Sequence, residues 1–247
     1  IIADELANLA HNDRAFQTQS PVNLPAAKCT FYVDGHPIQS HYSKVITHAF
    51  TLPAYKTYIA ERHGWKQDQI PQVDWELLKR AVTNTKQNHV QMSKFLHDKL
   101  PTNIVLAKSN PNQRRTCHYC TEDETFYHLL CCHNQLSADF RREITESVET
   151  YMDNKGLPNR FRREFLQCIH ISLKPQPPDE PPPTPACITS QLELGPRTFL
   201  KGLFTNQWRL LLTNTIQQDT NSDPLNGLDT LMGLIRIMWT TQLKLWE

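Results

Sequence analysis

The stretch from Arg114 to His133, RRTCHYCTEDETFYHLLCCH, constrains the chain more than any other because it gathers residues that bind metal ions. Cys117 and Cys120 form a C-x-x-C pair, and His128 follows after a short acidic loop. Zinc in proteins takes four ligands in a tetrahedron, commonly a cysteine pair on a turn facing a histidine and a cysteine on a helix. The stretch supplies both halves, and we expect it to fold around one structural zinc ion.

The second half of this stretch is predicted to be a helix. Glu124–Leu136 contains no glycine or proline, and Thr121, three residues before its start, fits a capping box. Side chains four positions apart share a face of a helix, which pairs His128 with Cys132. The alternative fourth ligand is His133, five positions after His128. The predicted ligand set is Cys117, Cys120, His128 and Cys132.

Composition bounds the remaining possibilities. The 247 residues suffice for one or two domains, and a net charge of +1 gives no overall field toward nucleic acid, so such contacts must come from local patches. Seven cysteines, an odd number, fit metal binding in a reducing compartment better than a disulfide beside free thiols. No signal peptide and no bilayer-length apolar run is present, so we expect an intracellular protein of the nucleus or cytoplasm, not secreted and without a membrane partner.

The rest of the chain predicts a mainly α fold, a helical bundle with one short β-hairpin and a small zinc knuckle. Thr30–Val33 and His36–Gln39 flank Asp34-Gly35, a dipeptide typical of a type I′ turn. In the first helical range Thr51 is expected to cap a second helix that begins near Pro53. Helical spacing of apolar residues predicts the ranges 41–63, 74–82, 85–99, 103–107, 137–151, 158–171, 197–216 and 225–245.

Proline-rich stretches divide the chain. Residues 11–27 are expected to be a linker, and residues 28–173 a helical domain that contains the metal motif at 114–133. Residues 174–186 include KPQPPDEPPPTP, which cannot form a helix or a central strand and serves as a second linker or loop. Residues 187–247 are expected to form a C-terminal pair of long helices.

Two local groups of basic residues are candidates for contact with nucleic-acid phosphates. One group precedes and enters the metal motif, and the other opens the helix that is predicted to begin near Pro158. Such contacts release counterions, so binding through them depends steeply on salt. The candidates are Lys108, Arg114, Arg115, Arg160, Arg162 and Arg163.

Three segments together resemble the C-terminal part of non-LTR retrotransposon polyproteins. They are ADELAN at Ala3–Asn8, KFLHDKLPTN at Lys94–Asn103 and CHYCTEDETFYHLLCC at Cys117–Cys132. The first is similar to the end of a type 1 ribonuclease H domain, and the other two to the reverse-transcriptase zinc-binding domain. The chain departs from the family at His133, where proline is common. Together with the ends at Ile1 and Glu247, the resemblance predicts a fragment of a longer protein.

The resemblance implies what this piece does. Residues 1–10 would be a remnant of the ribonuclease H C-terminal helix, and Asp4 the last carboxylate of a two-metal nuclease site whose other carboxylates are missing. The parent polyprotein would be an RNA-directed DNA polymerase with ribonuclease H. This chain would be a non-catalytic zinc-binding segment that binds or positions the element's RNA or DNA, with the rest of the polyprotein as partner and no small-molecule substrate.

The alternative function is a helical protein-interaction domain whose zinc is purely structural. The two predicted C-terminal helices, which carry Trp208 and Trp239, would dock a partner protein. A catalytic zinc is disfavoured because it keeps a coordination position open for water, whereas four strong protein ligands close the site.

Overall fold

The computed structural model describes residues 31–33, 35–38, 41–174, 185–218 and 227–244. The predicted ribonuclease H remnant with Asp4, the first linker, Asp34 and most of the proline-rich stretch lie outside these residues. The chain divides into two compact units, Ile1–Lys56 and Thr57–Glu247, and each is described by itself. Within the described ranges, no helix has both the length and the apolar character needed to cross a bilayer.

The first unit contains two short strands, β1 (Phe31–Val33) and β2 (His36–Ile38), paired antiparallel with Phe31 opposite Ile38. Gly35 in the turn between them has a φ of 77°, a conformation that favours glycine. Helix α3 (Tyr42–His63) follows and runs into the second unit.

Helix α3 contains Pro53 within its 22 residues, so the predicted restart at this proline is wrong. Thr51 does not cap a new helix, because its hydroxyl donates to the Thr47 carbonyl one turn back, 2.8 Å away. A proline removes one backbone donor from the helical ladder, and the turns on either side hold the helix together across that loss.

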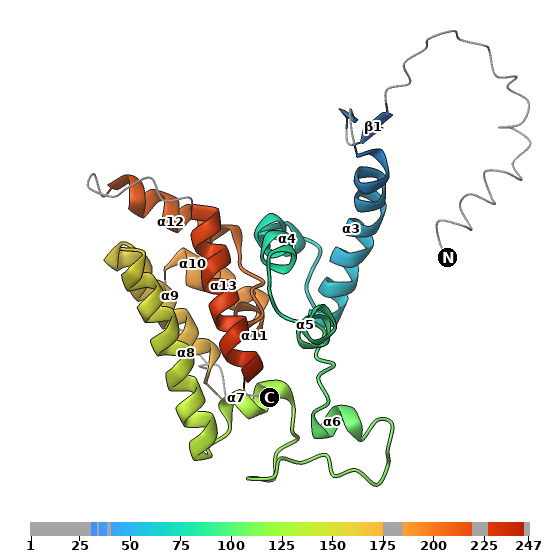
Figure 1. Ribbon diagram of the computed structural model, residues 1–247, viewed down its shortest axis with the longest axis vertical. Coiled ribbons are helices and arrows are strands. Elements are labelled where there is room, and N and C mark those ends of the chain that lie inside the picture. The colour runs from blue at the N-terminus through green and yellow to red at the C-terminus, as the bar shows by residue number, and fades with distance from the viewer. Residues whose placement is uncertain (1–30, 34, 39–40, 175–184, 219–226, 245–247) are drawn as a thin grey trace, which may run out of the picture. The chain divides into compact units, whose positions relative to one another are not determined.

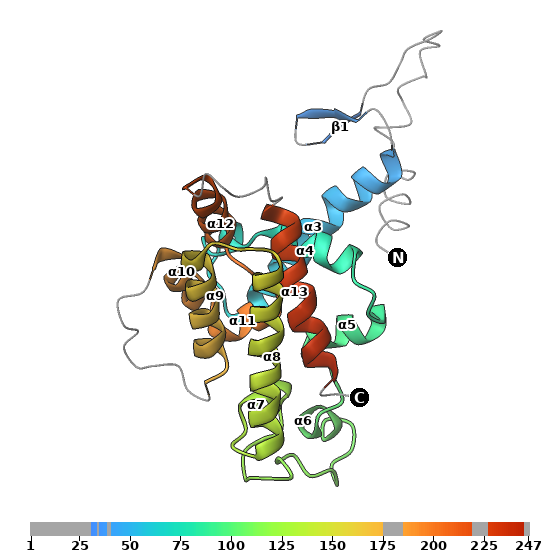
Figure 2. The same ribbon diagram turned by 60° about the vertical axis from the view of Figure 1, so that its left-hand side comes forward.

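The second unit is built of helices, which confirms the mainly α class. α13 packs against both α8 and α4, and α9 packs against α11 and α12, as the two ribbon views show (Figures 1 and 2). Besides the end of α3, the described elements are η1 (Ile70–Gln72), α4 (Trp75–Thr83), α5 (His89–Leu96), α6 (Asn103–Leu106), α7 (Phe126–Cys131), α8 (Gln135–Asn154), α9 (Asn159–Ser172), α10 (Ala186–Leu194), α11 (Pro196–Leu200), α12 (Asn206–Gln218) and α13 (Gly227–Lys244).

An aromatic cluster at the contacts of α9, α11 and α12 forms the centre of the core. Phe165 lies 5.0 Å from Phe199 and 5.3 Å from Trp208 between ring centroids, spacings at which aromatic pairs attract. Trp208 and Trp239 are both 0% exposed. Neither indole is available to a partner, and docking through other side chains of these two helices stays a prediction.

The described residues of the C-terminal region, 186–218 and 227–244, contain four helices, α10 to α13, where a pair was predicted. The expected helix over 197–216 is broken at Gly202, which has a φ of 76°. A Cβ atom at this position would lie 2.8 Å from Ile235 Cγ2 and 3.0 Å from Trp239, so glycine is required for the close approach of α13. The side chain of Gln191 on α10 then bonds the backbone beyond the break, at Leu203 and Thr205.

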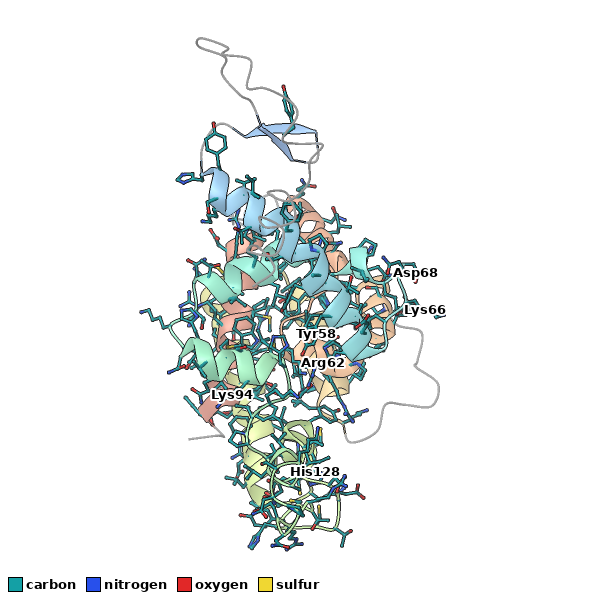
Figure 3. All side chains as sticks on the ribbon, turned by 90° about the vertical axis from the view of Figure 1, so that its right-hand side faces the viewer. Tyr58, Arg62, Lys66, Asp68, Lys94 and His128 are labelled. Atoms are coloured by element: carbon teal, nitrogen blue, oxygen red, sulfur yellow. The ribbon has the colours of Figure 1, made fainter. Side chains whose placement is uncertain are left out.

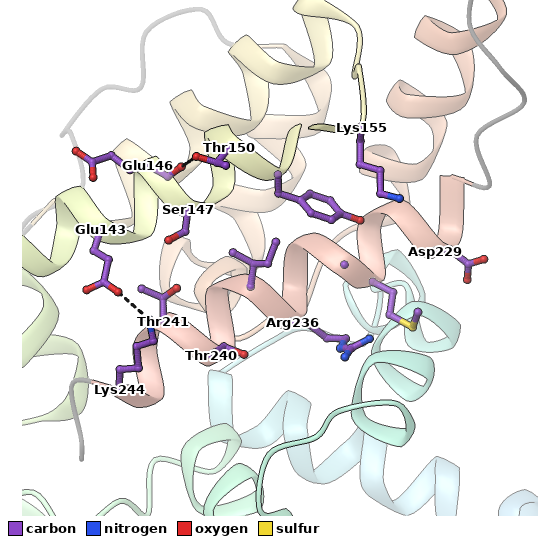
Figure 4. A pocket seen from close by; sticks show the side chains of 14 residues that line it. Glu143, Glu146, Ser147, Thr150, Lys155, Asp229, Arg236, Thr240, Thr241 and Lys244 are labelled. Atoms are coloured by element: carbon purple, nitrogen blue, oxygen red, sulfur yellow. Dashed lines mark hydrogen bonds and ion pairs between the residues drawn. The ribbon is translucent and has the colours of Figure 1, made fainter. Parts of the chain in front are cut away.

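Gly233 allows a similar close approach between α13 and α8. A Cβ atom at Gly233 would lie 2.0 Å from the hydroxyl oxygen of Tyr151, whose hydroxyl donates to the Thr230 carbonyl at 3.3 Å. Figure 4 shows the pocket between these helices, where Lys244 pairs with Glu143 at 3.0 Å.

We predict that Gly233→Ala lowers the free energy of unfolding by about 1 to 3 kcal/mol, because the Tyr151 ring must leave its place. The matched control is Gly227→Ala in the same helix, where the new Cβ would meet Leu212 at an ordinary 3.7 Å. Urea unfolding of both variants measures the difference. Equal stabilities would show that Tyr151 moves aside without cost.

Candidate metal centre

The first half of the site is a tight turn closed by backbone hydrogen bonds. Thr116 and Asp123 form an antiparallel β-bridge, and the Cys117 N–H donates to the Glu122 carbonyl at 2.8 Å. The Tyr119 N–H points back at Cys117 Sγ, 3.4 Å away. An N–H directed at sulfur stabilises a thiolate, which is the form that binds a metal ion.

The second half is helix α7 and the residue that ends it. Thr125 caps α7, with its hydroxyl oxygen accepting from the His128 N–H at 2.9 Å. Cys132 is the C-cap residue, and its N–H still donates to the His128 carbonyl at 2.7 Å. The expected spacing of these two ligands over one helical turn is therefore present.

The predicted bounds of this helix are wrong at both ends. Thr125, not Thr121, is the cap, because the Glu124 carboxylate accepts from the Asn103 N–H at 3.0 Å instead of closing a capping box. The helix stops at Cys131, and Asn134 caps the next helix, α8. A separate helix therefore begins where the sequence predicted a continuous one.

The four predicted ligands converge, with all ligand atoms within 4.8 Å of one another. Cys132 Sγ lies 3.9 Å from both Cys117 Sγ and Cys120 Sγ, and Cys120 Sγ lies 3.2 Å from His128 Nε2. Zinc–sulfur bonds of about 2.3 Å place two thiolates of a tetrahedron about 3.8 Å apart. The cluster thus has the dimensions of a metal tetrahedron. Figure 3 labels His128, one of the four residues of this cluster.

The electrostatics of the cluster favour a cation. Although burial opposes ionisation, hydrogen bonds from Asn134 and from the neighbouring thiols lower the pKa of Cys132. The pKa of Cys120 is raised: a hydrogen bond from the Glu122 backbone favours its thiolate, but desolvation and the Cys132 and Cys117 thiols outweigh it. Adjacent thiols thus compete for protons, and a divalent ion removes this competition by holding all of them as thiolates.

Cys132, and not His133, completes the cluster. His133 is exposed and lies outside the group of converging ligands. Cys131 is buried, but its thiol donates to the Leu173 carbonyl at 3.3 Å, away from the site. None of the six cysteines that the structure describes forms a disulfide, which removes the competing disulfide interpretation for these residues.

Arg141 on α8 is a supporting residue that the sequence reasoning missed. Its Nη1 atom donates to the carbonyls of Leu130 and Cys132, at 2.8 and 3.0 Å, and so fixes the end of α7. Ser137 adds a bond from its hydroxyl to the Leu129 carbonyl at 2.6 Å. Free carbonyls at a helix C-terminus are a recurrent target for arginine, but the sequence does not show which arginine of a neighbouring helix reaches them.

Three candidate phosphate contacts precede the cysteine turn in the sequence. Lys108, Arg114 and Arg115 are all exposed. Arg115 pairs with Asp123 at 3.0 Å across the β-bridge, and both side chains are about half exposed, at 61% and 47%. Arg114 donates from Nε to the Thr116 hydroxyl at 2.5 Å.

The second group of basic residues lies on α9 and consists of Arg160, Arg162 and Arg163. Two of these arginines pair with carboxylates of the same fold. Arg160 pairs at 3.0 Å with Glu164, whose side chain is only 4% exposed. Arg162 pairs with Asp153. Arg163 is exposed at the helix surface.

We predict that Cys120→Ala and His128→Ala each abolish stoichiometric zinc binding and unfold the segment between α6 and α8, because three remaining ligands hold the ion far more weakly. His133→Ala is the matched control and should keep about one ion per chain. Elemental analysis of the purified proteins, with cobalt(II) absorption as a test of tetrahedral geometry, measures the loss. Full metal content in both ligand variants would show that the assigned ligands are wrong.

Comparison of the chain with protein-family models, with curated proteins and with solved structures gave no match. The site is thus characterised by its own geometry, a Cys3His cluster that could bind a metal ion.

Proposed function

We propose that Cys117, Cys120, His128 and Cys132 hold one structural zinc ion. The convergence of the four ligand atoms supports this most directly. Three thiolates with one imidazole are a common ligand set of structural zinc, whereas hard cations such as magnesium prefer oxygen. Four protein ligands leave no coordination position for a reacting water, so the chemistry supplied by the ion would be structural.

We further propose that the chain is a non-catalytic segment of a retroelement polyprotein that binds or positions RNA or DNA. The sequence resemblance suggests this role, and the exposed cations on the metal-bound turn support it. Zinc would hold the turn in one conformation, so that Arg114 and Arg115, which adjoin it, are presented without the entropic cost of ordering a loop on binding.

Arg115 is better suited to phosphate contact than Arg160. The Arg115–Asp123 pair is exposed, and such pairs contribute little stability, so Arg115 can exchange its partner for a phosphate at small cost. Glu164, the partner of Arg160, is buried and also accepts from the Cys187 thiol at 3.0 Å. Removing Arg160 from it would leave a buried carboxylate without its cation, which is costly.

We predict that binding of single-stranded RNA or DNA by the zinc-loaded protein weakens steeply with salt. Arg115→Gln should reduce the slope of log K against log salt by roughly 0.7 to 0.9, the contribution of one phosphate contact. Fluorescence anisotropy with a labelled oligonucleotide between 50 and 200 mM salt, roughly the range in which such contacts are lost, measures the slope.

Arg160→Gln provides the contrasting variant. It should leave the slope unchanged and instead lower the free energy of unfolding by about 1 to 3 kcal/mol through the unpaired Glu164. If the zinc-loaded protein binds neither RNA nor DNA at low salt, the proposed nucleic-acid function is wrong, while the zinc assignment is unaffected.

A further inference from the structure

A second site lies between the end of α3, the turn after α5, α6, α7 and α11. It is a cavity of about 410 Å³, within the range of small-molecule sites. The walls combine apolar side chains, among them Phe95 and Leu130, with polar groups that include the hydroxyls of Thr102 and Thr125. The cavity does not contain the metal ligands, although α7 contributes to both sites.

The walls of this cavity carry an excess of positive charge. Four cationic side chains line it against one carboxylate, Asp98. Lys201 is 7% exposed and pairs with Asp98 at 2.5 Å, and Arg62 lies 3.7 Å from the same carboxylate. One carboxylate cannot balance this set, whose cations are Arg62, Lys108, Arg197 and Lys201.

Two nitrogen atoms in the walls are buried without a hydrogen-bond partner among the described residues. They are Arg62 Nε and His63 Nε2. Burial, together with the nearby Lys201, lowers the pKa of His63 to about 4, so the ring is neutral at pH 7 and one of its nitrogens can donate. Buried polar atoms without partners are costly, and a nearby anion would favour these polar groups electrostatically more than an apolar ligand would.

Arg197 also lines the cavity. Its guanidinium lies 4.0 Å from the centroid of the Tyr127 ring, a cation–π contact that orients the planar group. A guanidinium has five N–H donors and can bind a phosphate through two parallel hydrogen bonds.

The excess of cations is larger in this cavity than in two other pockets of the described residues, one of which has three cations against two carboxylates. The larger pocket between α8 and α13 (Figure 4) is lined by three carboxylates and three cations, so its charges balance. Those residues are Glu143, Glu146, Asp229, Lys155, Arg236 and Lys244. Figure 3 labels Arg62, near the end of α3, which lines the cationic cavity.

We propose that this cavity binds a phosphoryl group, held by Arg62, Arg197 and Lys201. Arg62, Arg197 and Lys201 less the Asp98 carboxylate leave two positive charges, which a doubly charged phosphate matches. Its oxygens can accept from guanidinium and ammonium donors at once. The proposal goes beyond nucleic-acid binding by the metal-bound turn, with which it shares only Lys108. The phosphoryl group can come from a free phosphate compound or from the end of a nucleic acid.

The probe is inorganic phosphate added to the zinc-loaded full chain at constant ionic strength with chloride. We expect saturable chemical-shift changes in the NMR signals of His63 and of the Arg197 side chain. Arg197→Gln should weaken phosphate binding by about tenfold, the loss of one charge-assisted contact. Arg197 is exposed, so this variant should fold normally, and Lys201→Met provides a second test at the buried cation.

Lys94→Gln is the charge-matched control, because Lys94 is exposed on α5 and does not line the cavity. It should change the affinity less than twofold, since an exposed charge at a distance is screened by salt. Oligonucleotides with and without a 5′-phosphate then distinguish the end of a nucleic acid from a free phosphate compound. If only the phosphorylated oligonucleotide displaces phosphate, the ligand is a nucleic-acid end. If neither oligonucleotide displaces phosphate, the ligand is a free phosphate compound. No saturable phosphate binding, or binding that neither Arg197→Gln nor Lys201→Met weakens, would overturn the proposal.

Discussion

Three sulfur atoms and one imidazole nitrogen share a volume that suits a cation at its centre, and the middle of the chain depends on that arrangement. Between Leu100 and Phe126, a stretch that the structure describes throughout, Cys117 is the only buried apolar side chain. A segment of this length without a core of its own cannot offset its conformational entropy by hydrophobic burial. Ligand–metal bonds would replace the missing core, in the way that small metal-binding domains use them.

The ligands could be predicted from the sequence because their geometry is local. The two residues between Cys117 and Cys120 largely determine the distance between their sulfur atoms. The one helical turn between His128 and Cys132 does the same for the second pair of ligand atoms. The helix bounds were not predictable in the same way, because Thr121 and Thr125 are both acceptable caps. The backbone N–H of Asn103, which is distant in the sequence, donates to the Glu124 carboxylate. Glu124 is then not available for a capping box with Thr121, and Thr125 is the cap. The break at Gly202 was also not predictable from the sequence, because only the packing of Ile235 and Trp239 shows why the helix must break there.

Charge is the property that the sequence described least well. Arg160, Arg162 and Arg163 form the densest basic run outside the metal motif, yet two of them neutralise carboxylates within their own fold. Conversely, the cationic cavity draws its charges from Arg62, Lys108, Arg197 and Lys201, which are spread over the chain and form no motif. What separates a binding arginine from a structural one is the burial of its carboxylate partner, and burial is a property of the tertiary fold.

Helix α7 connects the two proposed sites. Its cap Thr125 and the side chains of Phe126 and Tyr127 line the cationic cavity, while His128 and Cys132 complete the metal cluster within the next six residues. A metal ion that fixes the backbone of α7 also fixes the tyrosine on which Arg197 stacks. Occupation of either site would then reduce the entropic cost of ordering the other, and this coupling must be reciprocal, so phosphate would tighten metal binding by the same factor by which the metal tightens phosphate binding.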